Sequence, residues 1–166
     1  MEREFQSHTF EPIFNGKSKI LILGTFPSVK SRENNFYYGH PQNRFWSVLA
    51  EILKTETPCS IVEKKKMLLE NKIAIWDVVG SCEISNSSDM SIKNVLPNDI
   101  SVILENSNIK TVYANGKTAE KLYNKYLKNQ TGKEIIPLPS TSPANAAFSK
   151  ERLVKAWKII EEDLEK

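Results

Sequence analysis

One stretch of the sequence concentrates side chains that suit recognition of a flat heterocycle. It reads Phe36-Tyr37-Tyr38-Gly39-His40-Pro41-Gln42-Asn43-Arg44-Phe45-Trp46. Aromatic faces stack on planar rings, and amide groups hydrogen-bond to the polar edges of such rings. The composition of this stretch therefore favours binding of a nucleobase, although Phe45 and Trp46 are also expected to pack onto the core.

Other chemistries have weaker support in the sequence. The segment Asn115-Gly116-Lys117-Thr118 is similar to the end of a phosphate-binding loop, but Thr111 stands where that motif requires its first glycine. No Gly-x-Gly-x-x-Gly follows an expected strand, so a dinucleotide site has no support. His8 and His40 are the only histidines, and neither forms a metal-ligand spacing with a cysteine. We therefore expect no metal and no cofactor.

The elements that must position these residues alternate between strands and helices. Four short apolar, β-branched runs predict strands at Lys19–Leu23, Ile73–Val79, Thr111–Tyr113 and Glu134–Leu138. Helices are expected at Phe45–Leu53, from Ser60 through Leu69, at about Lys117–Lys128, and after Ser149 with Leu153, Ala156, Trp157, Ile160 and Leu164 inward. This alternation predicts a three-layer α/β/α sandwich around a mainly parallel four-stranded sheet, because parallel neighbours need crossover connections.

Ligands of such open sheets collect beyond the carboxyl ends of the strands. That rule directs attention to four segments, Gly24–Trp46, Trp76–Glu83, Asn115–Thr118 and Pro139–Asn145. The aromatic and amide-rich stretch lies inside the first of them, so the expected topology and the side-chain chemistry indicate the same edge of the sheet.

Length, charge and hydropathy limit the number of domains, the kinds of partner and the location that we expect. The 166 residues fit one domain, residues 1–166, with no repeat or linker. The longest apolar run, Ile20–Leu23, is too short for a membrane span, and the first residues lack a hydrophobic stretch, so we expect a cytoplasmic protein without membrane contact. A net charge of +3 permits a polyanionic partner without requiring one. We expect a monomer.

Three motifs resemble those of the uracil-DNA glycosylase superfamily. Leu21-Ile22-Leu23-Gly24-Thr25-Phe26-Pro27-Ser28 is similar to its first motif, a strand that ends in Gly-x-Asn/Asp-Pro. Gly39-His40-Pro41-Gln42-Asn43-Arg44-Phe45-Trp46 is very similar to the signature of the mismatch-specific uracil and thymine glycosylases. Pro139-Ser140-Thr141-Ser142-Pro143-Ala144-Asn145 falls where the second motif belongs, shortly before the last helix. Their order and spacing cover almost the whole chain.

The positions at which this sequence departs from these motifs indicate one branch of the superfamily. Phe26 occupies the position of the Asn or Asp that handles water in most of the superfamily, and Ser140 and Ala144 replace the usual first and wedge residues of the second motif. With Ile75-Trp76-Asp77-Val78, these changes look like the hypoxanthine (deoxyinosine) DNA glycosylase branch. That branch lacks the catalytic residue of the first motif and uses an asparagine elsewhere, which the resemblance assigns to Asn43.

The resemblance implies a monofunctional enzyme of base excision repair that hydrolyses the N-glycosidic bond of a flipped deaminated base, most specifically hypoxanthine, in DNA. The base-binding residues it implies are Gly24, Thr25, Phe26, Pro27, Tyr38, His40, Trp76 and Asp77. The DNA-binding residues are Ser140, Thr141, Ser142, Pro143 and Asn145. Three alternatives stay open: a uracil or mismatched-thymine glycosylase, a catalytically inert DNA-lesion-binding relative, and a structural or small-molecule-binding α/β domain.

Overall fold

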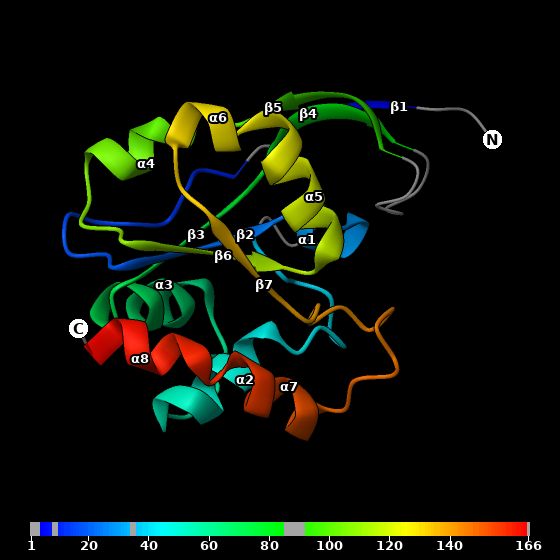
Figure 1. Cartoon of the computed structure of the whole chain (residues 1–166). Helices are drawn as coiled ribbons and strands as arrows, with labels where there is room; N and C mark the ends of the chain where they lie inside the picture. The colour runs from blue at the N-terminus through cyan, green and yellow to red at the C-terminus, as the bar shows by residue number, and fades with distance from the viewer. Residues whose placement is uncertain (1–3, 8–9, 34–35, 85–91, 166) are drawn as a thin grey trace.

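The computed structural model describes residues 4–7, 10–33, 36–84 and 92–165, whose strands form two sheets (Figure 1). The larger sheet has four strands, all parallel, in the order β3, β2, β6, β7. Their bounds are β2 Ile20–Gly24, β3 Ile73–Asp77, β6 Thr111–Asn115 and β7 Ile135–Leu138. The predicted four-stranded sheet is confirmed.

The helices lie between these strands or after the last of them, and they cover both faces of the sheet. They are α1 Val29–Glu33, α2 Phe45–Leu53, α3 Ile61–Glu70, α4 Ser101–Glu105, α5 Lys117–Tyr126, α6 Lys128–Thr131, α7 Lys150–Trp157 and α8 Ile159–Glu165. Two expected caps are confirmed, because the Ser60 hydroxyl accepts from Glu63 N at 3.1 Å and the Ser149 hydroxyl accepts from Arg152 N at 3.2 Å. The expected last helix divides at Lys158 into α7 and α8.

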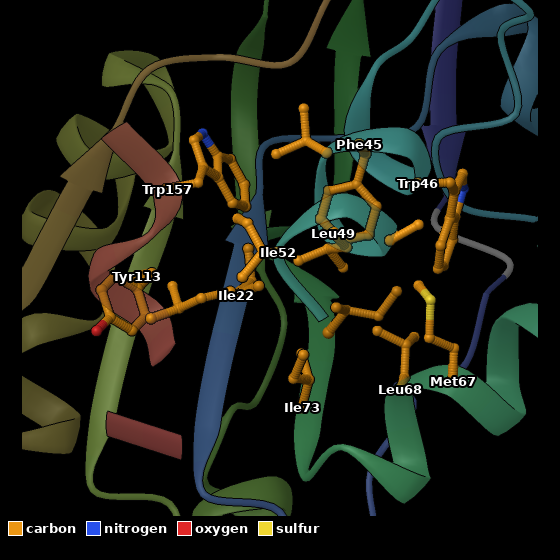
Figure 2. Close-up of a cluster of buried hydrophobic side chains, with 14 of the residues drawn as sticks. Ile22, Phe45, Trp46, Leu49, Ile52, Met67, Leu68, Ile73, Tyr113 and Trp157 are labelled. Carbon is orange, nitrogen blue, oxygen red and sulfur yellow. The ribbon is translucent and has the colours of Figure 1, made fainter. Parts of the chain in front are cut away.

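Strand β2 lies at the centre of the core. Its five residues are all buried, and its side chains alternate between two apolar clusters because successive strand side chains point to opposite faces. Ile20 and Ile22 join the cluster beneath α2, α3, α7 and α8, part of which is shown in Figure 2. Leu21 and Leu23 face the cluster beneath α4 and α5. Helices on both faces confirm the three-layer sandwich.

The register of the larger sheet brings the carboxyl ends of its strands to one edge. Gly24, the last residue of β2, pairs with Asp77, the last residue of β3. Asn115, the last residue of β6, pairs with Leu138, the last residue of β7. The loops that follow these strands therefore start side by side, which is the arrangement that the sequence pattern predicted.

The second sheet was not predicted. It is antiparallel, in the order β1 (Glu4–Ser7), β4 (Val79–Ile84), β5 (Lys93–Pro97). The expected strand Ile73–Val79 is wrong at its end, since β3 stops at Asp77 and Val79 begins β4 in the other sheet. Val78 and Val79 are both fully buried, so the hydrophobic pattern continues through the change of sheet without a polar break. Within the described ranges, no helix has the length and apolar character needed to span a membrane.

The core of α2 gives a stability prediction. Leu49 is fully buried against β2 and α7, so Leu49→Ala should lower the free energy of unfolding by about 2–5 kcal/mol through lost burial and a cavity. Leu96→Ala is the matched control: Leu96 is 63% exposed, and its truncation should change the free energy by less than about 0.5 kcal/mol. Urea unfolding followed by circular dichroism measures both. Equal losses in the two variants would contradict this assignment of the core.

Candidate active site

The loops that hold the predicted site residues contact one another at the carboxyl edge of the larger sheet. The backbone N–H of Arg44, just before α2, donates to the carbonyl of Thr141 in the loop after β7, at 3.1 Å. The backbone N–H of Gly39 donates to the hydroxyl of Ser31 on α1, at 2.9 Å. The aromatic stretch is thus held between the segment after β2 and the loop after β7, although these segments are far apart in the sequence.

Asn43 is anchored at this junction through its carboxamide oxygen. Oδ1 accepts the backbone N–H of Phe45 at 2.9 Å and the hydroxyl of Thr141 at 2.9 Å. The first contact caps α2 from the residue before its N-cap position, Arg44, because it satisfies the backbone N–H of Phe45, the first residue of the helix. The second ties Asn43 to the loop after β7. Capping occupies the oxygen of the side chain and leaves the amide nitrogen, Nδ2, for another partner, so a capping role and a substrate-facing role are compatible.

Thr141 is in turn held by Asn115 at the end of β6. The backbone N–H of Thr141 donates to Asn115 Oδ1 at 3.0 Å, and Asn115 Nδ2 donates to the Thr141 hydroxyl oxygen at 3.1 Å. Both residues are buried, with Thr141 only 1% exposed. The predicted contact between the Thr141 side chain and DNA is therefore replaced by an internal one, because burial closes its hydroxyl off from any outside partner.

Arg44 gathers the loop after β7 around its guanidinium group. Its N–H groups donate to the carbonyls of Ser142 at 2.8 Å and Asn145 at 3.2 Å, and also to the carbonyl of Phe148. Its Nε donates to the carbonyl of Thr141 at 3.4 Å. Guanidinium is permanently charged and carries five N–H donors in a fixed plane, so this one side chain binds four carbonyls of the loop.

Gly24 lies in close contact with two predicted base-site residues. A Cβ at this position would collide with Asp77 Oδ1 and would lie 2.8 Å from the Tyr38 hydroxyl oxygen. Asp77 is buried at the end of β3, and its backbone carbonyl accepts from Asn98 Nδ2 at 2.8 Å. The structure thus brings Gly24, Tyr38 and Asp77 together, as the sequence predicted.

Tyr38 is held in an uncommon backbone conformation. Its φ is 52°, a left-handed value that costs about 1–3 kcal/mol in a residue with a side chain and often occurs at functional sites. Its ring stacks on Phe45 with the ring centroids 4.0 Å apart and the planes 22° apart. A base can therefore stack only on the opposite face of the Tyr38 ring.

The neighbouring Tyr37 has a structural role. Its hydroxyl donates to the carbonyl of Glu11 at 2.6 Å. Burial, and then the negative charge of Asp77, raise the pKa of the Tyr37 hydroxyl above its ordinary value. The group therefore stays protonated and keeps this hydrogen bond, which ties the aromatic stretch to the chain that precedes β2.

The rest of the first motif lines the same region. Thr25 and Pro27 are buried, and Phe26 is half-buried against Val79 and Cys82 of the second sheet. The Arg32 guanidinium lies over the Phe26 ring, 5.7 Å from its centroid. The Phe26 side chain is thus an apolar surface and offers no hydrogen bond to water or to a base.

Trp76 and His40 each make a hydrogen bond to a backbone group. The Trp76 indole N–H donates to the carbonyl of Phe10 at 3.2 Å, and the ring packs against both apolar clusters. His40 Nδ1 accepts the backbone N–H of Gln42 at 3.0 Å, so a neutral His40 ring carries its proton on Nε2. Trp76 therefore contributes to the core, while His40 presents an N–H donor from its other nitrogen.

The loop after β7 presents two serine hydroxyls. Ser140 Oγ accepts the backbone N–H of Ser142 at 3.1 Å, and Ser142 Oγ accepts that of Ala144 at 3.1 Å. Each hydroxyl serves as an acceptor inside the loop and keeps its own proton for an outside acceptor such as a phosphate oxygen. Asn145 instead braces the loop, donating from Nδ2 to the Ser140 carbonyl at 3.0 Å. Pro143, which is half-buried, lies between Ser142 and Asn145 in the sequence.

A cavity of about 370 Å³ lies at the opposite, amino-terminal edge of the larger sheet. It is lined by residues at the ends of α2, α3 and α8, with side chains of both charges such as Lys54 and Glu165. The predicted base-site residues do not line it. Across the described ranges, no three His, Cys, Asp or Glu side chains are grouped to hold a metal ion.

Comparison with known proteins identifies the family. A family model described as the uracil DNA glycosylase superfamily matches residues 11–162. The chain belongs to the uracil DNA glycosylase superfamily. Proteins named hypoxanthine DNA glycosylase from Methanosarcina acetivorans and Methanosarcina barkeri are 34% and 33% identical to this superfamily member over 145 residues, 86% of this chain and 90% of each relative.

A solved structure supports the same assignment at the level of the fold. It is the solution NMR structure of a Methanosarcina acetivorans protein, provisionally described as a uracil DNA glycosylase. The two chains are 31% identical and superimpose with a TM-score of 0.82, over 98% of this chain and 100% of the other. This chain and the Methanosarcina acetivorans protein therefore share one fold over almost their whole lengths.

Sequence reasoning missed two residues of the site, Arg44 and Asn115. Arg44 lies inside the Gly39–Trp46 motif, but the carbonyls it binds are about a hundred positions away along the chain. Asn115 lies in a segment that the strand-end rule selected, yet its partner Thr141 is 26 positions away. Both act by organising other site residues. The sequence indicated only their positions, Arg44 inside a motif and Asn115 at the end of a strand.

The crowding around Gly24 gives a second stability prediction. Gly24→Ala forces Asp77 and Tyr38 apart and should lower the free energy of unfolding by about 1–3 kcal/mol, the usual cost of overpacking. Gly16→Ala is the matched control, because the nearest atom to a Cβ at that position is 3.9 Å away. Urea unfolding of both variants tests this. A Gly24→Ala protein as stable as Gly16→Ala would show that the contact is looser than described.

Proposed function

We propose that this protein is a monofunctional DNA glycosylase that hydrolyses the N-glycosidic bond of hypoxanthine in DNA and leaves an abasic site. One observation carries the proposal: a fixed carboxamide, Asn43, stands at the carboxyl edge, where Phe26 provides no polar group in the first motif. The names of the two Methanosarcina relatives support hypoxanthine as the base.

The substrate is a nucleotide flipped out of the duplex. Extrusion costs a few kcal/mol, and least for a base that is already mispaired, which favours hypoxanthine opposite thymine. In this proposal the base stacks on the face of Tyr38 opposite Phe45, against the wall formed by Gly24, Thr25, Phe26, Pro27 and Asp77. The hydroxyls of Ser140 and Ser142 bind phosphates that flank the lesion.

Breaking the N-glycosidic bond builds positive charge on the sugar and negative charge on the departing base. The enzyme must stabilise both charges in the transition state. Fixed hydrogen-bond donors at the base, and water at the opposite face of the sugar, meet that requirement without a lysine adduct. Asn43 supplies the carboxamide, beside either the base or the water. The protein's partner is DNA, and we propose that the enzyme acts as a monomer in the cytoplasm.

Two other functions use the same site. A uracil or mismatched-thymine glycosylase is favoured by the superfamily's name, but Phe26 lacks the water-handling group of those enzymes. A catalytically inert lesion-binding relative is favoured by that same missing group. The first would cleave the same kind of glycosidic bond but in a nucleotide with a different base, and the second would bind a flipped base and leave its glycosidic bond intact.

An incision assay separates these functions. The protein is incubated with labelled duplexes that carry deoxyinosine, deoxyuridine or a G·T mismatch, and abasic sites are then cleaved with alkali. We expect strand breaks at deoxyinosine alone. Breaks at deoxyuridine or at the mismatch would support the uracil or thymine enzyme, whereas duplex binding without any breaks would identify an inert binder.

Asn43→Ala tests the catalytic assignment. Loss of its carboxamide should reduce the single-turnover rate of hypoxanthine release about 100-fold or more, and change duplex affinity far less. The substitution also removes the hydrogen bond to the first backbone N–H of α2, which costs about 0.5–1.5 kcal/mol of stability. Ser60→Ala removes a comparable cap from α3, away from the site, and should keep the wild-type rate. If both variants release the base at the wild-type rate, Asn43 is not catalytic.

A further inference from the structure

We propose that Asn115 and Thr141 are positioning residues that fix the carboxamide of Asn43 with its NH₂ toward the substrate, so that Asn43 acts as a hydrogen-bond donor to the departing base. This inference rests on the proposed function, because it specifies how Asn43 acts in that reaction. It is carried by the direction of each hydrogen bond in the chain Asn115–Thr141–Asn43.

The direction is set at one end by Thr141. Its backbone N–H can only donate, and it donates to Asn115 at 3.0 Å, so the Asn115 atom in that contact is the oxygen. The other end of the Asn115 amide is then NH₂, which donates to the Thr141 hydroxyl oxygen at 3.1 Å. Because the hydroxyl already accepts there, its own proton is left to be donated to Asn43 at 2.9 Å.

The direction is set independently at the other end by Phe45. Its backbone N–H donates to the same Asn43 atom at 2.9 Å, which again must be the oxygen. Two backbone donors, one at each end of the chain of contacts, therefore demand the same orientation of the Asn43 amide. A flipped amide would put NH₂ against the N–H of Phe45 and against the Thr141 proton, leaving donors facing donors.

This orientation decides between the two roles of Asn43. Oδ1 has two lone pairs and accepts two hydrogen bonds, so it has no capacity left to accept a proton from a water molecule. Within the described chain, Nδ2 meets no acceptor, and its two protons are left for a ligand. Asn43 can therefore donate to an electron-rich base, and it cannot orient a nucleophilic water by accepting from it.

The proposed hydrolysis needs no hydrogen-bond acceptor at Asn43. The bond between C1′ and the base breaks, and its electron pair moves onto the base, where the Asn43 N–H stabilises the growing negative charge. Water oxygen forms the new bond to C1′ of the resulting cation-like sugar. The proton that this water releases neutralises the departed base anion through solvent.

Asn43→Asp is the sharpest test of the donor role. The aspartate side chain keeps one oxygen for Phe45 and Thr141, but it presents a second oxygen in place of NH₂. A donor role predicts that Asn43→Asp loses deoxyinosine excision as fully as Asn43→Ala, about 100-fold or more in single turnover. If Asn43→Asp retains near-wild-type rates, Asn43 acts on water and the inference is overturned while the proposed function stands. A wild-type protein without deoxyinosine excision would instead defeat the proposed function.

Asn115→Asp tests the positioning role. The introduced carboxylate accepts the Thr141 hydroxyl proton and turns it away from Asn43, so the orientation of the Asn43 amide is then set only by the N–H of Phe45. We expect a slow enzyme at neutral pH with little change in duplex affinity. The rate of this variant relative to wild type should rise as pH falls from 8 to 5, because the protonated carboxyl group donates to Thr141 again. A pH-independent ratio would overturn the positioning role.

Matched variants separate positioning from a loss of fold. Thr141→Val removes the hydroxyl and keeps the shape and backbone N–H, so the rate should fall about 10-fold or more, whereas Thr141→Ser should restore most of it. Equal rates for the valine and serine variants would also overturn the proposal. Asn129→Asp introduces the same charge on exposed α6 and should leave the rate and its pH profile unchanged. If Asn115→Asp does not fold, the Thr141 pair and Asn43→Asp still decide.

Discussion

Thr141 joins three segments that the sequence separates widely, and the geometry of the candidate site depends on that junction. Its backbone and hydroxyl connect Asn115, at the end of β6, to Asn43, just before α2. Asn115 and Thr141 are buried, so a polar group of either residue would cost about 1–3 kcal/mol if it lost its partner. A fully satisfied network of this kind is rigid, because moving one member would leave its buried partners without hydrogen bonds. The guanidinium of Arg44 adds a second set of bonds around the same loop.

The proposed catalytic asparagine lies outside the first motif, and the structure gives this position a physical basis. Position 26 lies two residues beyond the end of β2, and Phe26 packs there against Val79 and Cys82 of the second sheet. Asn43 lies at the start of α2, and there a single carboxamide both caps a helix and faces the edge where ligands of such sheets collect. The cap gives Asn43 a structural reason for its orientation, and the amide nitrogen remains for chemistry.

Most of the fold followed from the sequence for local reasons. The apolar run at Lys19–Leu23 and the caps at Ser60 and Ser149 predicted elements that the structure confirms, since strand burial and capping depend on near neighbours. The antiparallel sheet escaped prediction because β1 pairs with β4 across more than seventy residues. Motif positions indicated where Asn43, Tyr38 and Ser140 lie. Burial of Thr141 and the clamp at Arg44 arise from tertiary contacts that no local spacing encodes.

The influence of Asn115 on the reaction through Asn43 is tested most directly by a double-mutant cycle on the single-turnover rate of hypoxanthine release. The cycle compares wild type with Asn43→Ala, Asn115→Leu and the variant that carries both substitutions. If Asn115 acts only by orienting Asn43, the double variant is no slower than Asn43→Ala alone, because the group being oriented is already gone. Independent, multiplying effects of the two substitutions on the rate would contradict this role of Asn115.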